Sequence, residues 1–227
     1  IQSDFVQVDE DTRINVKLKS GQETEINAPG PKVTHAQFEQ LLSQIRRTTN
    51  DDIVIVAGSV PNSIPSDAYA QIAQITEKTG AQLVVDAEKD LVETVLPYRP
   101  LFIKPNKDEL EVMFNTTVKS DEDVIKYGKE ILKKGAQSVI ISLGGDGAIY
   151  VDQHQSIKAV NPQGHVVNTV GSGDSTVAGM VAGVSMGLNI DEAFQQAVAS
   201  GTATAFSEDL ATRDAIENIK SQVTISV

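Results

Sequence analysis

The residues best suited to chemistry lie between Val166 and Gly187. Three small residues, Gly171, Ser172 and Gly173, precede a run with helical spacing, and Asp174 falls in its first turn. The first N–H groups of a helix lack partners within the helix and carry the positive end of its dipole, so this turn can hold a phosphate. A carboxylate beside a bound phosphate suits a general base for phosphoryl transfer. The structural alternative is that the acid stabilises the helix start and the small residues allow close packing.

The elements around this turn alternate between strand and helix patterns. Residues 53–57 form a continuous apolar run typical of a strand buried on both faces. Similar short runs occur at 83–85, 101–103 and 139–143, with helical patterns between them. This alternation predicts an α/β domain with a parallel central sheet and helices on both faces. Specific helices are expected over 121–134 and over a stripe of Phe38, Leu41, Leu42 and Ile45 with Thr34 as N-cap.

Polar residues follow the apolar runs directly. In open α/β sheets, ligands bind beyond the carboxyl ends of the strands, so these residues should converge at one edge. Turn residues also occur at strand ends for backbone reasons alone. The residues concerned are Gly58 with Ser59, Asp86, Lys104 with Asn106, Ser142 with Gly144, and Gly171 to Asp174.

The amino-terminal part has a different period. Residues 13–19 alternate strictly between polar and apolar, and a two-residue turn follows at Ser20–Gly21. Residues 23–26 would then form the second strand of a hairpin. This pattern predicts a hairpin with Ile14, Val16 and Leu18 on one face. A half-polar hairpin suits a lid better than a core. We therefore expect a lid over residues 5–28, a hinge at 29–33, and an α/β domain over 34–227 that contains the phosphate-binding turn.

Composition narrows the function. The 227 residues carry 19 Lys and Arg against 31 Asp and Glu, a net charge of -12. This charge argues against a general nucleic-acid binder or a protein of anionic membrane surfaces, although a local cationic cluster can still bind a phosphorylated substrate. The sequence has no cysteine, which fits a cytoplasmic location, and its three histidines show no zinc-ligand spacing. No apolar run approaches the roughly 20 residues of a membrane span.

The run from Asn168 to Asp174, N-T-V-G-S-G-D, resembles the Asp-Thr-x-Gly-Ala-Gly-Asp signature of the ribokinase-like, or phosphofructokinase B, family of sugar kinases. Asn168 stands where the family has its first Asp. Later motifs match in the same order, so the resemblance covers nearly the whole chain. It implies a three-layer α/β/α domain with a small β lid, ATP and Mg²⁺ as cofactors, and a catalytic turn made of Gly171, Ser172, Gly173 and Asp174.

The resemblance also implies nucleotide and metal contacts. Asn106 and Glu109, at i and i+3 on one helix face, match the family's Asn-x-x-Glu motif for magnesium, although ordinary helix-start chemistry would also explain them. The glycine turn after Ser142 is expected between two strands, the second at 149–151. It matches a nucleotide-binding turn of the family, and a simple β-turn is the alternative. The small residues at 199–205 would flank the adenine or serve only packing. The implied nucleotide-binding residues are Lys104, Asn106, Ser142, Gly144, Gly145, Asp146, Gly147, Ser200 and Gly201.

On the acceptor side, the segment from Thr12 to Lys17 resembles the lid of sugar-phosphate kinases, where the matching Arg helps to hold the phosphate that the sugar already carries. We therefore expect Arg13, Lys17 and the strand-end Ser59 to contact the substrate, and a homodimer could form through the lid. The family's opening strand and its Gly-Gly-Lys-Gly-x-Asn motif have no match, so we expect an amino-terminal segment to be missing.

Residues 85–88, 103–106 and 206–210 favour the 1-phosphofructokinase branch of the family. The expected reaction is ATP-dependent phosphorylation of fructose 1-phosphate to fructose 1,6-bisphosphate. The alternatives are a tagatose-6-phosphate kinase or, for this chain alone, a non-catalytic nucleotide-binding module.

Overall fold

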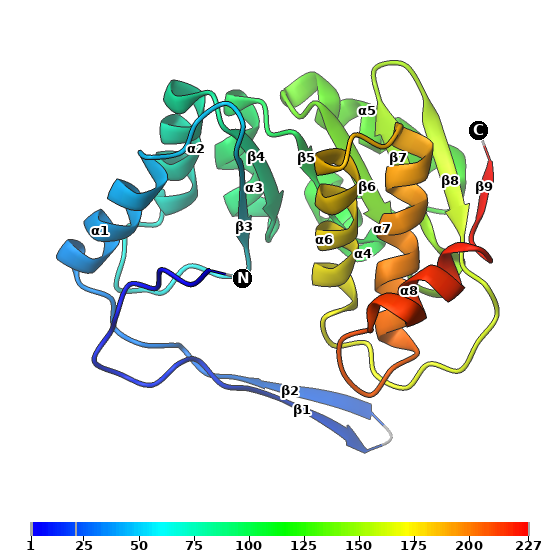
Figure 1. The fold of residues 1–227 in the computed structure, drawn as a ribbon, viewed down its shortest axis with the longest axis horizontal. Coiled ribbons are helices and arrows are strands. Elements are labelled where there is room, and N and C mark those ends of the chain that lie inside the picture. Colours follow the sequence, from blue (N-terminus) through cyan, green and yellow to red (C-terminus); the bar gives the residue numbers. More distant parts are fainter. Residues whose placement is uncertain (1, 21, 227) are drawn as a thin grey trace.

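A computed structural model describes residues 2–20 and 22–226. Gly21 lies outside the described residues, and with it half of the predicted Ser20–Gly21 turn. The chain forms an α/β body from which one hairpin extends (Figure 1). Within the described residues, no helix is both long and apolar enough to cross a bilayer.

In the described part of the chain, seven strands form one sheet whose spatial order follows the chain order from β3 to β9. The first four strands are parallel to one another, as predicted. The last three pair antiparallel; β7 corresponds to the strand predicted at 149–151, whereas β8 and β9 were not predicted. The strands are β3 (Ile53–Ala57), β4 (Gln82–Asp86), β5 (Phe102–Ile103), β6 (Ser138–Ser142), β7 (Ala148–Asp152), β8 (Ser156–Val160) and β9 (Thr224–Ser226).

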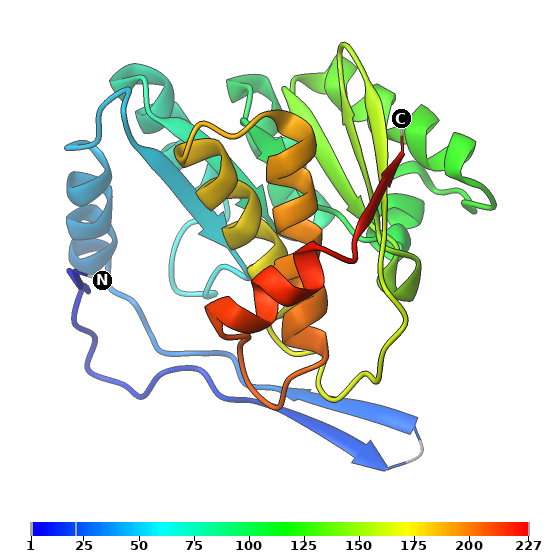
Figure 2. The same cartoon turned by 45° about the vertical axis from the view of Figure 1, so that its right-hand side comes forward.

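Helices cover both faces of this sheet and complete three layers (Figure 1, Figure 2). The parallel crossovers all advance in one direction, and right-handed connections of this kind place their helices on the same face. Helices α1 to α5 cover that face, and α6 to α8 cover the other. The helices are α1 (His35–Ile45), α2 (Ala68–Thr79), α3 (Lys89–Val95), α4 (Lys107–Phe114), α5 (Asp121–Lys134), α6 (Ser172–Ser185), α7 (Ile190–Ala205) and α8 (Arg213–Lys220), with 3-10 turns η1 (Leu96–Tyr98) and η2 (Gly144–Asp146).

The strand period of two divides the core between the two faces. Leu83 and Val85 of β4 are buried under the helices α1 to α5, whereas Val84 between them is buried under α6 to α8. Both faces of the central strands are therefore apolar, as a covered parallel sheet requires. Strand β3 departs from this pattern, because it lies at the sheet edge and Ile55 is 45% exposed. The prediction that residues 53–57 are buried on both faces was wrong.

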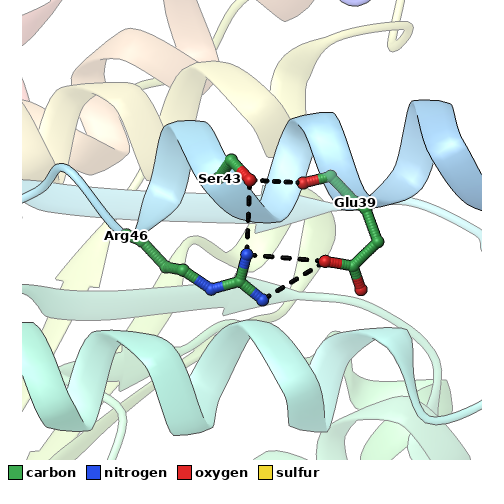
Figure 3. A network of polar contacts seen from close by, with 3 residues as sticks. All are labelled: Glu39, Ser43 and Arg46. Atoms are coloured by element: carbon green, nitrogen blue, oxygen red, sulfur yellow. Dashed lines mark hydrogen bonds and ion pairs between the residues drawn. The ribbon is translucent and has the colours of Figure 1, made fainter.

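Helix boundaries follow local signals closely. Thr34 caps α1 as predicted, and Gln37 completes a reciprocal capping box with it. Helix α5 has the predicted bounds, with acids in its first turn and lysines in its last, as the helix dipole favours. On the solvent side of α1, Arg46 contacts both Glu39 and Ser43 (Figure 3). Exposed contacts of this kind contribute little to stability.

The predicted hairpin is a separate two-stranded sheet of β1 (Asn15–Ser20) and β2 (Gln22–Asn27). Val16 pairs with Ile26 across the two strands. In both views the hairpin leaves the region of α1 and passes the end of the body at which α6 begins (Figure 1, Figure 2). Its apolar side chains are exposed: Ile14, Val16, Leu18 and Ile26.

Candidate active site

The turn before α6 has the backbone that its glycines predict. Gly171 is the N-cap with φ +79°, a left-handed conformation that glycine adopts without strain. A Cβ atom at Gly171 would lie only 2.8 Å from a side-chain carbon of Leu210. The helix begins at Ser172, and Asp174 lies exposed in its first turn. The turn therefore combines helix N–H groups with one accessible carboxylate.

Small residues also allow α6 to pack closely on α7, as the structural alternative held. A Cβ atom at Gly179 would lie 2.6 Å from Ser200 Oγ, and the Ser172 hydroxyl donates to the Gly201 carbonyl at 2.7 Å. Ser200 is buried in this contact and donates to the Gln196 carbonyl at 2.8 Å. Its side chain is therefore used in helix packing, which does not favour the nucleotide contact expected of it.

The polar residues after the strands converge at the carboxyl ends of the parallel strands, as predicted. The Gly58 N–H after β3 donates to the Asp86 carbonyl at the end of β4 at 3.0 Å. Lys104 follows β5, and its Nζ lies 3.2 Å from Asp86 Oδ2. A Cβ atom at Gly173 would lie 3.3 Å from the same Nζ, so the ammonium is close to the α6 turn.

The Lys104–Asp86 pair is largely removed from solvent, with side-chain exposures of 7% and 17%. Burial raises the pKa of Asp86 above its ordinary value; Lys104 opposes this rise, and the negative charge of Asp174 adds to it. Asp174 therefore lies close enough to interact with this pair. The charge of Lys104 is already paired with Asp86, so a phosphate bound beside this pair would share the Lys104 ammonium with that carboxylate.

A cavity of about 710 Å³ lies beside this cluster, within the range of small-molecule sites. The start of α4, the η2 turn, the start of α6 and the end of α7 form its walls. Asn106 and Ser142 come together through a parallel β-bridge. The predicted site residues that line the cavity are Asn106, Ser142, Gly144, Gly145, Gly147, Ser172, Gly173 and Gly201.

Three predicted nucleotide-binding residues are not among those that line the cavity. Lys104 lies next to Gly173, Ser200 lies in the α6–α7 contact, and Asp146 is exposed in η2. Residues 161–164, Val166 and Phe206 contribute to the walls without having been predicted. Residues 161–171 have no regular secondary structure, and the side chains of Val166, Val167 and Val170 are exposed.

The two residues predicted to bind the metal, Asn106 and Glu109, cap the start of α4. Asn106 is the N-cap with an extended backbone, so it does not lie on a helix face with Glu109 as expected. Its Oδ1 accepts the Glu109 N–H at 2.8 Å, and Glu109 Oε2 accepts the Asn106 N–H at 2.8 Å. Each of these residues still has oxygen lone pairs for a hydrated Mg²⁺. Among the described residues, no three His, Cys, Asp or Glu side chains are grouped to hold a metal by themselves.

Two predicted acceptor residues meet at the base of the hairpin. Arg13 Nη1 donates to Ser59 Oγ, and Arg13 Nε donates to the Ala28 carbonyl at 2.8 Å. Ser59 directly follows the Gly58 turn at the end of β3. Lys17 lies further along β1 with an exposed side chain, opposite Glu25 in the strand register.

Comparison with known proteins identifies the family. The sequence profile of the pfkB family carbohydrate kinases matches residues 1–215. The chain belongs to the pfkB family. It is therefore an ATP-dependent sugar kinase, and the three-layer fold agrees with this assignment.

Individual relatives give the detail. The chain is 41% identical over 226 residues to the 1-phosphofructokinase of Bacillus subtilis (strain 168), covering 100% of this chain and 75% of that protein. It is 35% identical over 227 residues to the D-tagatose-1-phosphate kinase of Bacillus licheniformis, again covering 100% and 75%. A crystal structure of a phosphofructokinase candidate from Staphylococcus aureus is 81% identical, with a TM-score of 0.90 and coverage of 100% and 74%.

Two residues beside the site of this pfkB kinase had no functional role in the sequence interpretation. Asp86 belonged to the strand-end set but had no assigned task. Tyr69 lies on α2 and was not singled out in the sequence as a site residue, yet its hydroxyl donates to the Gly58 carbonyl at 2.9 Å. The position of Asp86 directly after a predicted strand was the sequence signal that could have assigned it to the site. No sequence signal linked Tyr69 to Gly58, because they come together only when α2 packs on the sheet.

Proposed function

We propose that this pfkB kinase transfers the γ-phosphoryl group of ATP to the 6-hydroxyl of fructose 1-phosphate and forms fructose 1,6-bisphosphate and ADP. One observation carries the proposal. The exposed carboxylate of Asp174 lies in the first turn of α6, where the same turn lines a nucleotide-sized cavity and lies beside the buried Lys104. The names of the Bacillus subtilis and Bacillus licheniformis relatives support a ketose 1-phosphate as acceptor.

In the proposed reaction, ATP occupies the cavity and presents its γ-phosphate to the α6 turn. Asp174 accepts the proton of the sugar hydroxyl, because an alcohol is a poor nucleophile until that proton has an acceptor. The sugar oxygen then forms a bond to the γ-phosphorus, and the bond from that phosphorus to the bridging oxygen of ADP breaks. The N–H groups of the turn and Lys104 stabilise the charge on the transferred group.

We also propose that Mg²⁺ binds with the nucleotide near Asn106 and Glu109. Their remaining lone pairs suit contacts through water, which Mg²⁺ retains readily. The ion would neutralise phosphate charge. The two side chains would continue to cap the start of α4 while they orient the water molecules bound to the ion.

The acceptor is tested with a panel of sugar phosphates and coupled detection of ADP. We expect the highest kcat/KM for fructose 1-phosphate. Tagatose 1-phosphate, which differs only in configuration at C4, is the candidate favoured by the Bacillus licheniformis relative. Tagatose 6-phosphate carries its phosphate at the other end and would be phosphorylated at O1. A preference for either tagatose phosphate would correct the substrate. Tight ATP binding without turnover on any acceptor would instead indicate a nucleotide-binding module.

The hairpin suggests a homodimer formed through its apolar face. Ile14, Val16, Leu18 and Ile26 are 67%, 42%, 50% and 56% exposed, and a second copy of the hairpin would cover this surface. Sedimentation velocity should give a dimer that Val16→Glu dissociates. A monomer at all concentrations would exclude this assembly.

A further inference from the structure

The Gly58 peptide is held by hydrogen bonds on both sides. Gly58 follows β3 with φ +83°, and its N–H donates to the Asp86 carbonyl at 3.0 Å. Its carbonyl accepts the hydroxyl of Tyr69, which is 6% exposed on α2, at 2.9 Å. A glycine with positive φ has few steric limits on the direction of its carbonyl. The Tyr69 hydroxyl therefore supplies a constraint that the backbone itself lacks.

The constraint passes along the chain to Arg13. The Gly58–Ser59 peptide plane determines where the Ser59 side chain begins, and Ser59 Oγ accepts a hydrogen bond from Arg13 Nη1. Arg13 Nε donates to the Ala28 carbonyl on the other side of the hairpin base. A guanidinium has more N–H donors than these two contacts use, so the anchored Arg13 can still bind a phosphate.

We propose that Tyr69 is a positioning residue for acceptor binding. Its hydroxyl fixes the Gly58–Ser59 peptide and, through Ser59, the orientation of Arg13 towards the phosphate that the sugar already carries. This inference rests on the proposed function, in which Arg13 holds that phosphate. Burial and the charge of Asp86 raise the pKa of Tyr69 to about 12, so the hydroxyl remains a donor at neutral pH.

The test is Tyr69→Phe, which removes the hydroxyl and keeps the ring. Loss of one neutral hydrogen bond that orients the acceptor site should raise the KM for the sugar phosphate about three- to tenfold. The kcat and the KM for ATP should stay within about twofold, because the cavity and Asp174 are untouched.

Tyr150→Phe is the matched control. Tyr150 is 3% exposed in β7 and donates one hydrogen bond to Asp152 at 3.0 Å, outside the proposed site. Both variants should lose a few degrees of melting temperature, Tyr150→Phe at least as much because its partner is a carboxylate, and only Tyr69→Phe should change the acceptor KM. Equal kinetic effects of the two variants, or an unchanged acceptor KM in Tyr69→Phe, would overturn the inference.

A double-mutant cycle with Ser59→Ala tests the route. If Tyr69 acts through Ser59, Tyr69→Phe should add less than about twofold to the acceptor KM in the Ser59→Ala background. Full additivity would overturn this route. Arg13→Ala distinguishes a failure of the proposed Arg13 contact with the acceptor from a failure of the positioning role of Tyr69. If it raises the acceptor KM and Tyr69→Phe does not, only the positioning role fails. If it leaves the KM unchanged, the proposed acceptor contact fails and the Tyr69 inference fails with it.

Discussion

Replacement of Asp174 by Asn is the most direct test of the proposed chemistry. Asparagine keeps the shape of the side chain and can still accept hydrogen bonds in the first turn of α6, but it cannot take the hydroxyl proton. Loss of a general base costs about 10²–10⁴ in rate, which equals about 2.7–5.4 kcal/mol of transition-state stabilisation. We expect kcat to fall by this factor in the intact enzyme.

The effect of this change on folding should be small. Asp174 is exposed, and its favourable interaction with the helix dipole is worth about 0.3–1 kcal/mol. Its repulsion of Asp86 acts in the opposite direction, since the charge of Asp174 raises the pKa of Asp86. For a chain of this size, a net change below 1 kcal/mol shifts the melting temperature by less than about 4 °C.

The assay compares kcat at saturating substrates, the Kd for ATP by calorimetry, and the melting temperature. Asp191→Asn is the control, because it removes the same charge from the first turn of α7, at the opposite end of that helix from Gly201. We expect the control to keep full kcat and Asp174→Asn to keep its ATP affinity. Turnover of Asp174→Asn within a factor of a few of wild type would refute the role as base. A large loss of melting temperature with kcat retained would show that Asp174 serves only the helix.

Three further predictions concern the surroundings of the turn. Glu109→Gln should keep the capping hydrogen bond to the Asn106 N–H, since the amide oxygen still accepts it, but should shift activity to higher Mg²⁺ at saturating ATP; an unchanged Mg²⁺ titration would remove Glu109 from the metal site. Arg13→Ala should raise the acceptor KM about ten- to a hundredfold without changing the KM for ATP, and Arg13→Lys should restore only part of it; equal changes in both KM values would indicate a folding defect. The pKa of Asp86 is raised in the folded state, so the native protein binds the Asp86 proton more tightly than the unfolded chain does. Proton binding to Asp86 therefore adds to the free energy of unfolding. This stabilisation is complete below the ordinary pKa of 3.8 and is lost as pH rises through the native pKa. Asp86→Asn should therefore remove that component from the pH dependence of stability in urea unfolding, and identical pH profiles would contradict it.

Local signals in the sequence predicted much of the fold. The bounds of α5, the Thr34 cap and the strand ends depend on residues within a few positions of one another, so propensity and capping chemistry are sufficient. The position of β3 at the sheet edge depends on which strands lie beside it, and its apolar composition does not report that. The antiparallel pairs of β6 with β7 and of β7 with β8 follow short connections, whereas the pairing of β8 with β9 joins residues far apart in the chain and depends on tertiary structure.

The same division applies to the site. The Gly171–Asp174 turn could be predicted from the sequence alone, because positive φ, free helix N–H groups and a first-turn acid are all encoded locally. The mutual capping of Asn106 and Glu109 is also local, since the two residues are three positions apart and helix-start chemistry is sufficient for it. The place of Ser200 in the contact between α6 and α7 depends instead on how the two helices pack. The tertiary structure also brought Tyr69 to Gly58 and Lys104 to Asp86. The physical reason is that a side chain's long-range partner is chosen by the packing of whole helices on the sheet, which no local pattern specifies.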